Sequence, residues 1–278
     1  MTSSIYRSPL YDVPLWQAPA RYTVTLQTLE MDIMKKITLL SYALIAYTVG
    51  MASLLYLMGF LINLYVPKSI DSGTTEGLWL PLFSNMGLLV AYFAIHSVMA
   101  RPWFKAAWQR IIPAGTERST YILISGVTVF LLVLLWQPLT TTIWLTENPI
   151  ARNLIITLYL GGWTLMTLAT FNINHFAFFG LQQAWASLRS QRQQSPGFSA
   201  RYLYALTRHP ISLGWLIVMW ATPAMSLGHL LMAIVATLYI FIITPVEEAD
   251  LVAEIGDDYR HYQQTVRRFL PIPKKVAQ

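Results

Sequence analysis

Residues 202–262 read YLYALTRHPISLGWLIVMWATPAMSLGHLLMAIVATLYIFIITPVEEADLVAEIGDDYRHY, an apolar stretch with a polar cluster at each end. Its central part, residues 211–246, has no Lys, Arg, Asp or Glu over 36 residues. A helix needs only roughly 20 residues to cross a bilayer, and Pro223 and Gly228 near the middle favour a turn. We therefore expect a hairpin of two membrane helices that brings both polar clusters to one side of the membrane.

The two polar clusters are Arg208-His209-Pro210 before the hairpin and Glu247-Glu248 at its end. A proline fits the first turn of a helix, where its missing N–H costs nothing. The start of that helix offers unpaired N–H groups and a positive dipole end to a carboxylate. Adjacent carboxylates accept hydrogen bonds from sugar hydroxyls or an amine. The pair of clusters would suit a ligand with an acidic end, a ribose and a positive centre.

The composition is that of an integral membrane protein. Of 278 residues, 55% are hydrophobic and only 12% are charged, which favours one compact domain in the bilayer. There are no cysteines, which excludes disulfides and thiolate metal sites. No metal-ligand cluster, phosphate-binding glycine loop or nucleic-acid motif occurs, so we expect neither a metal nor a nucleic-acid partner.

Apolar segments predict an all-α, polytopic transmembrane bundle of five to six spans, including the hairpin. The four segments before the hairpin cover about residues 37–66, 78–99, 120–144 and 153–171. Residues 1–34 are assigned to a loosely ordered cytosolic arm, and residues 35–278 to the membrane domain. Residues 249–269 are expected to form an amphipathic helix on the cytoplasmic surface.

Positive charge predicts the orientation of the bundle. With the N-terminus in the cytoplasm, only Lys68 and Arg152 of the nineteen Lys and Arg residues fall outside, as the positive-inside rule requires. Both termini are then cytoplasmic, and His229 lies on the opposite side. The titratable residues expected together at the cytoplasmic ends are His96, His175, His209, Glu247, Glu248 and Asp250. Such a site would take a charged, water-soluble cofactor from the cytosol.

Four motifs resemble the isoprenylcysteine carboxyl methyltransferase superfamily in order and spacing. They stand here as Arg208-His209-Pro210, Gly214, Glu247-Glu248 and Gly256/Tyr259/Tyr262. Over about residues 37–273 the chain more closely resembles one branch, the membrane-bound methanethiol S-methyltransferases related to NnrU-type proteins. The matching stretches include Val66–Asp71, His96–Pro102, Glu117–Tyr121 and Asn174–Phe176.

The resemblance implies S-adenosylmethionine as methyl donor and methanethiol as acceptor, with dimethyl sulfide as product. Residues 202–262 would be the cofactor module. The residues assigned to the cofactor are Tyr204, Arg208, His209, Pro210, Gly214, Glu247, Glu248, Tyr259 and Tyr262. Ser212 stands where the superfamily usually has a tyrosine, and Tyr202 or Tyr204 is the candidate replacement.

Individual roles within this set stay open. Arg208 either pairs with the cofactor carboxylate or holds one of the two glutamates, and the other glutamate contacts the ribose or the amine. Adjacent helical positions point about 100° apart, so Glu247 and Glu248 should not share a task. Tyr259 and Tyr262 either cover the sulfonium or adenine or anchor the chain at the membrane interface.

Methyl transfer from a sulfonium to a thiol needs alignment and a base rather than a metal. A neutral histidine can take the thiol proton at pH 7. His175 is the first candidate and His96 the second, each weighed against a role in hydrogen-bonding helix ends. Asn174 could orient the thiol or His175, and helix capping explains it equally well.

Three alternatives remain at the level of sequence. The acceptor could be a lipid or a prenylcysteine carboxylate, or the chain could be a non-catalytic assembly or transport factor of the NnrU type. Hydrogen sulfide is a further possible acceptor. In each case the protein is expected in the bacterial inner membrane, among lipids, with its site on the cytoplasmic side.

Overall fold

The computed structural model describes residues 20–74, 77–189 and 200–271. Within them, five helices are long and apolar enough to span a membrane, which confirms the all-helical polytopic bundle. They are α1 (Ala20–Leu61), α2 (Trp79–Ala100), α4 (Glu117–Leu135), α5 (Pro149–Ile173) and α10 (Leu227–Ile255). The shorter elements are α3 (Pro102–Trp108), α6 (His175–Phe178), α7 (Leu181–Leu188), α8 (Leu203–Leu206), α9 (Pro210–Trp220), α11 (Asp257–Thr265), β1 (Thr142–Leu145) and β2 (Ala224–Ser226).

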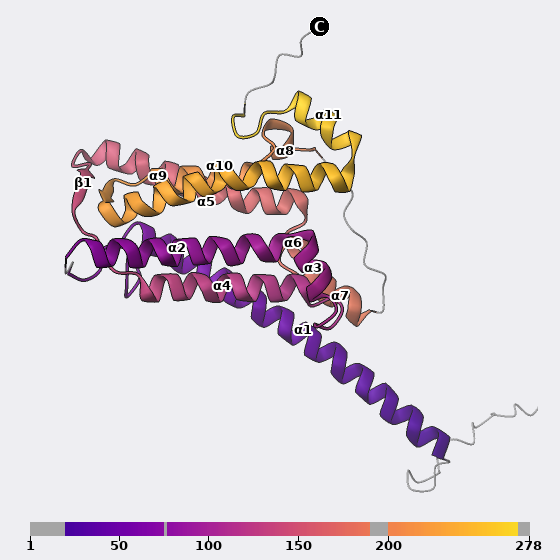
Figure 1. Ribbon diagram of the computed structural model, residues 1–278. Coiled ribbons are helices and arrows are strands. Elements are labelled where there is room, and N and C mark those ends of the chain that lie inside the picture. Colours follow the sequence, from indigo (N-terminus) through magenta and orange to yellow (C-terminus); the bar gives the residue numbers. More distant parts are fainter. Residues whose placement is uncertain (1–19, 75–76, 190–199, 272–278) are drawn as a thin grey trace, which may run out of the picture.

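The long helices form two layers (Figure 1). One layer contains α1, α2 and α4, and the other contains α5, α9 and α10. Within the layers α1 packs against α4, and α5 against α9, while α2 contacts α10 across the gap. The N-terminal half of α1 projects beyond the bundle (Figure 1). Helix therefore reaches into the stretch assigned to the arm, although residues 1–19 lie outside the described part.

The third predicted span, residues 120–144, is too long. α4 ends at Leu135, and the chain then runs extended into β1, which pairs antiparallel with β2. Pro138 has no N–H to continue a helix, and the carbonyl of Leu139 instead accepts a hydrogen bond from the N–H of Gly228 at 2.9 Å. The 19 residues of α4 still cover about 28 Å at 1.5 Å per residue.

The hairpin after residue 210 forms, but its two arms are unequal. α9 has 11 residues, about 16 Å of helix, which is roughly half of the bilayer core. α10 has 29 residues and begins at Leu227. Ser226 caps it, because its side chain accepts a hydrogen bond from the N–H of His229 at 3.2 Å. The bend predicted near Pro223 is therefore confirmed, whereas a full crossing by the first arm is not.

The predicted surface helix over residues 249–269 is wrong in its limits. α10 continues without interruption through Glu248 to Ile255, and α11 starts only after Gly256. Gly256 has φ +80°, a left-handed conformation that glycine adopts without strain and that turns the chain. α11 then lies across the end of the bundle beside α8 (Figure 1).

α5 and α9 approach closely at two glycines. A Cβ atom on Gly214 would lie 2.4 Å from Cγ of Met166 and 2.8 Å from the carbonyl oxygen of Gly162. The missing side chain lets the start of α9 lie directly on α5. Gly214 thereby fixes where the preceding Arg208-His209-Pro210 segment sits.

Candidate functional site

The two polar clusters of the hairpin meet at one end of the bundle. Arg208 Nε lies 2.8 Å from Glu248 Oε1, and both side chains are buried. The C-terminal half of α10 carries Glu248 to this end, and the segment before α9 carries Arg208. The juxtaposition expected from the hairpin is thus present, and it involves Glu248 rather than Glu247.

Both oxygens of the Glu248 carboxylate accept hydrogen bonds from other residues of the protein. Oε1 accepts hydrogen bonds from Arg208 and from His209 Nε2 at 3.0 Å. Oε2 accepts from Arg268 at 2.8 Å and from Gln263 at 3.3 Å. Four donors from three segments converge on one carboxylate, so Glu248 braces the site.

Arg208 is equally committed. Besides Glu248, its guanidinium donates to the carbonyl oxygens of Gln263 and Val266. The backbone N–H groups of Arg208 and His209 donate to the carbonyls of Arg267 and Arg268 at 2.9 and 3.1 Å. The segment after α11 is therefore fastened to the Arg-His-Pro motif. Arg208 holds Glu248, one of the roles that the sequence left open, and a part in cofactor binding stays a prediction.

Glu247 stands apart from this network. Its carboxylate takes part in no hydrogen bond or ion pair with the described residues, and the side chain is half-buried. It interacts electrostatically with His209 and Arg101. Of the two adjacent glutamates, Glu248 holds the arginine, and the two differ in surroundings because neighbouring helical positions point about 100° apart. Contact of Glu247 with a ligand stays a prediction.

Three tyrosines pack on the cluster. Tyr259 and Tyr262 are buried and meet edge to face with ring centroids 5.6 Å apart. The Tyr262 hydroxyl donates to the carbonyl oxygen of Tyr204 and so ties α11 to α8. Burial, reinforced by Glu248, raises the pKa of Tyr259 to about 12, so its hydroxyl stays protonated at neutral pH. Burial also raises the pKa of Tyr204.

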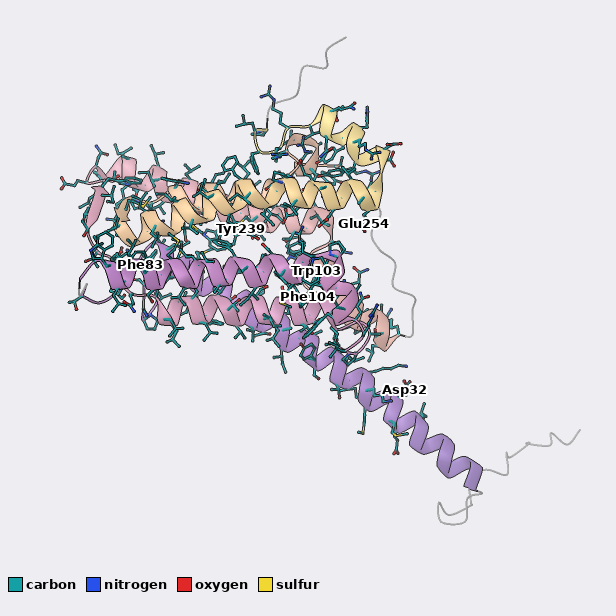
Figure 2. All side chains as sticks on the ribbon, in the orientation of Figure 1. Asp32, Phe83, Trp103, Phe104, Tyr239 and Glu254 are labelled. Carbon is teal, nitrogen blue, oxygen red and sulfur yellow. The ribbon has the colours of Figure 1, made fainter. Side chains whose placement is uncertain are left out.

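A cavity of about 320 Å³ lies between the two layers. Its walls are mostly apolar and come from α1, α2, α4, α5, α6, α9 and α10. Ile211, next to Pro210, lines it, and so does Ile240, two turns before Glu247-Glu248. The polar groups in the wall are His96, His175, Tyr92, Tyr121, Tyr239, Ser53, Ser125, Thr167 and Thr170. Figure 2 shows Tyr239 on the inner side of α10, and its hydroxyl bonds to Ser97 Oγ of α2 at 2.8 Å.

His175 lies in the cavity wall with both ring nitrogens hydrogen-bonded. Thr170 Oγ1 lies 2.8 Å from Nδ1, and the Tyr47 hydroxyl lies 3.1 Å from Nε2. The ring also stacks on Phe171 at 4.3 Å. Burial lowers the pKa of His175 below its ordinary value, so the ring is neutral at pH 7.

His96 lies in the same cavity wall, on α2. The Tyr121 hydroxyl is 2.8 Å from its Nε2, and Ser125 Oγ is 3.3 Å from its Nδ1. Both histidines proposed from the sequence therefore share one cavity, each held by hydroxyl groups. No pattern in the sequence predicted their hydroxyl partners, although Tyr121 and Ser125 are four residues apart on one face of α4.

Asn174 is placed as a helix cap. Its Oδ1 accepts from the N–H of Ala177 at 3.1 Å, its Nδ2 donates to Gln182 at 2.5 Å, and it does not line the cavity. Asn172 accepts from the N–H of Leu203 at 3.2 Å. The capping interpretation thus accounts for Asn174, and a part in catalysis stays a prediction.

Comparison with known proteins identifies the family. Over 236 residues the sequence is 43% identical to the methanethiol S-methyltransferase of a Pseudomonas species, covering 85% of this chain and 91% of the relative. Over 242 residues it is 38% identical to the methanethiol S-methyltransferase of Mycobacterium tuberculosis, covering 87% and 99%. The chain belongs to the methanethiol S-methyltransferase family. The resemblance seen in the motifs is thereby confirmed, and with it the expectation of a membrane-bound methyltransferase.

A more distant similarity extends beyond the methanethiol S-methyltransferases. The sequence is 25% identical over 189 residues to Nurim of Bos taurus, which covers 63% of this chain and 70% of Nurim. No protein-family model matches the chain, and no solved structure does.

Proposed function

We propose that the protein transfers a methyl group from S-adenosylmethionine to methanethiol, giving dimethyl sulfide. The observation that carries this proposal is the apolar cavity with two hydroxyl-bonded histidines in its wall, next to the Arg208–Glu248 cluster. A small apolar thiol suits such a cavity, because it loses little hydration there. Family membership favours this enzyme over a non-catalytic assembly factor.

The residues present fit the proposed cofactor. Glu247 has no hydrogen-bond partner within residues 20–74, 77–189 and 200–271, and its carboxylate can accept hydrogen bonds from a hydroxyl or an amine. Tyr92, Tyr239 and Trp215 present aromatic rings to the cavity, and a ring face attracts a cation by about 0.5–2 kcal/mol. S-adenosylmethionine, when bound, supplies a sulfonium methyl group that the acceptor sulfur takes, while the methyl–sulfonium bond breaks and leaves its electron pair on the donor sulfur.

The proton of the thiol passes to a histidine in this proposal. A thiolate is the better nucleophile, and the neutral ring of His175 can accept the proton at Nε2, where the Tyr47 hydroxyl now lies. His96 is the second candidate, with Tyr121 in the corresponding position.

The proposed site is on the cytoplasmic side of a bacterial inner membrane, with both termini in the cytoplasm. The motif Arg208-His209-Pro210, Arg101 and Arg268 lie at one end of the bundle, whereas Lys68 and Arg152 follow or begin helices at the other. This asymmetry is the one that the positive-inside rule predicts. The bacterial source of the two methanethiol S-methyltransferases compared above is consistent with it.

The test is a headspace assay. Membranes containing the protein, incubated with S-adenosylmethionine and methanethiol, are expected to release dimethyl sulfide, and membranes with the double variant His96→Gln, His175→Gln are not. A parallel incubation with hydrogen sulfide tests the second acceptor. Binding of S-adenosylmethionine without any volatile product would overturn the proposed acceptor, and absence of binding would overturn the methyltransferase itself.

A further inference from the structure

A second cation lies beside the cavity wall, and its terminal nitrogens have no hydrogen-bond partner among the described residues. Arg118, in the first turn of α4, lies 5.1 Å above the ring centroid of Tyr121 and 4.7 Å above that of Phe178. Its Nε donates to the carbonyl oxygen of Phe178 at 2.6 Å. Both rings line the cavity. The guanidinium is thus held beside two residues of the cavity wall by contacts with their rings and by one hydrogen bond.

The other edge of this guanidinium remains available. A guanidinium has five N–H donors, and Nε–H is the only one of Arg118 that is bonded within the described part of the chain. No carboxylate of the described residues forms an ion pair with it. The four remaining donors have the fork geometry that binds a carboxylate through two parallel hydrogen bonds.

Arg208, for which the sequence left open either a ligand carboxylate or a glutamate, does not offer such a fork. Its Nε is bonded to Glu248, and Nη1 is bonded to two backbone carbonyls. Among the described residues, Arg118 therefore has two terminal nitrogens without a hydrogen-bond partner, whereas Arg208 has one.

Glu247, on α10 in the other layer of the bundle, has no hydrogen bond or ion pair with any residue that the structure describes. It is close enough to Tyr121 and Tyr239, which both line the cavity, to interact with them electrostatically. Arg118 interacts with Tyr121 and with His96 in the same way. Arg118 on α4 and Glu247 on α10, which belong to different layers (Figure 1), thus both lie within electrostatic reach of Tyr121 in the cavity wall.

We infer that Arg118 and Glu247 together bind the zwitterionic amino-acid end of the cofactor. Arg118 holds the carboxylate through its fork, and Glu247 accepts hydrogen bonds from the ammonium group. The inference rests on the proposed function, which supplies a cofactor with such an end. It gives Arg118 a ligand-binding role. A residue of α4 then binds the carboxylate of the methionine part of the cofactor, and a residue of α10 binds its ammonium group.

Two nucleosides separate this role from a merely structural one. S-adenosylhomocysteine carries the amino-acid end, and 5′-methylthioadenosine lacks it. In calorimetry on the purified full-length protein, Arg118→Gln is expected to lower the affinity for S-adenosylhomocysteine by about 10- to 100-fold, because the variant loses a charge-assisted pair of hydrogen bonds. Binding of 5′-methylthioadenosine should not change. Arg110→Gln, an exposed position in the preceding loop, should change neither.

Glu247→Gln is the complementary variant. This variant should also lower the affinity for S-adenosylhomocysteine and leave the affinity for 5′-methylthioadenosine unchanged. Decarboxylated S-adenosylmethionine divides the two residues, because it keeps the ammonium group and lacks the carboxylate. Its affinity should fall in Glu247→Gln and stay at the wild-type value in Arg118→Gln.

The inference is overturned if Arg118→Gln weakens both nucleosides equally or leaves both unchanged. Should that variant fail to fold, Arg118→Lys keeps the charge without the fork. If Arg118→Lys lowers only the affinity for S-adenosylhomocysteine, the inference is supported. If it lowers the affinity for both nucleosides equally, the inference is overturned. If the wild-type protein binds neither nucleoside, the proposed function is refuted. If the wild-type protein binds both, and each variant changes the affinity for both nucleosides equally, only the role of Arg118 and Glu247 is refuted.

Discussion

Glu247 and Glu248 are neighbours in the sequence with opposite surroundings. Glu248 is 3% exposed and accepts hydrogen bonds from four side chains, three of them basic. Glu247 has no such partner among the described residues. A glutamate pair read from the sequence cannot reveal this difference, because it arises where α11 and the segment after it return to the end of α10.

Replacing Glu248 should therefore damage the fold first. Glu248→Gln leaves Arg208 and Arg268 without their common anion, and loss of one partner of a buried ion pair costs about 3–5 kcal/mol. We expect a clearly lower apparent melting temperature in detergent. Glu254→Gln, on the exposed surface of the same helix near its end (Figure 2), is the control and should melt like the wild type, as should Glu247→Gln.

His175 predicts the pH dependence of activity. Burial lowers the pKa of His175 from the ordinary histidine value of about 6.5. The ring therefore stays neutral, and able to accept a proton, at pH values somewhat below 6.5. Dimethyl sulfide formation should hold its rate from pH 8 to below pH 6.5, and fall only as the pH passes through the lowered pKa. His175→Gln should reduce kcat by about 10²–10⁴-fold and remove this acid limb. An unchanged profile in the variant would exclude His175 as the base.

The residues that hold the two histidines were harder to predict than the histidines themselves. His96 and His175 were expected at the cytoplasmic ends of their spans, and the structure places both in one cavity. Tyr47 reaches His175 from a helix 128 positions earlier in the chain, a distance over which helical periodicity carries no information. Arg118, by contrast, lies on one face of α4 with Tyr121 and Ser125, a spacing that was visible in the sequence.

At the scale of the elements, the contact of α5 with α9 depends on two missing side chains. Gly214→Ala would place a methyl group 2.8 Å from the Gly162 carbonyl, which is backbone and cannot yield by a change of rotamer. Overpacking of this kind costs about 1–3 kcal/mol. We expect a lower melting temperature together with weaker cofactor binding, because α9 positions the Arg-His-Pro segment.

A neighbouring glycine provides the control for this prediction. Gly161 is exposed, and a Cβ atom there meets nothing within 4 Å. Gly161→Ala should leave the stability unchanged or raise it slightly, because alanine favours the helix by up to about 1 kcal/mol. Equal melting temperatures for the two alanine variants would show that the α5–α9 contact tolerates a side chain.

Hydrophobicity located the helices better than it located their ends. The apolar run over residues 120–144 continues past Leu135, but its last part is extended chain and strand. Pro138 was the visible signal for this break. The pairing of β1 with β2 was not visible, because it depends on the turn between α9 and α10 lying against the end of α4. α9 is short for the same reason.

At the scale of the whole molecule, the absence of cysteine makes the orientation directly testable. Single replacements Lys68→Cys and Arg152→Cys should react with a membrane-impermeant maleimide added to spheroplasts. Arg110→Cys, at the opposite end of the bundle, should react only after the membrane is opened. Labelling in the reverse order would place the Arg208–Glu248 cluster outside the cell, where S-adenosylmethionine is not supplied.

The fastening of residues 207–209 to residues 266–268 separates the spanning helices from the part of the chain that completes the charged cluster. Arg208 takes its carbonyl partners from Gln263 and Val266, whereas α10 already ends at Ile255. A chain truncated before residue 263 would therefore keep the five long helices, yet it would lose the contacts that hold Arg208 against Glu248.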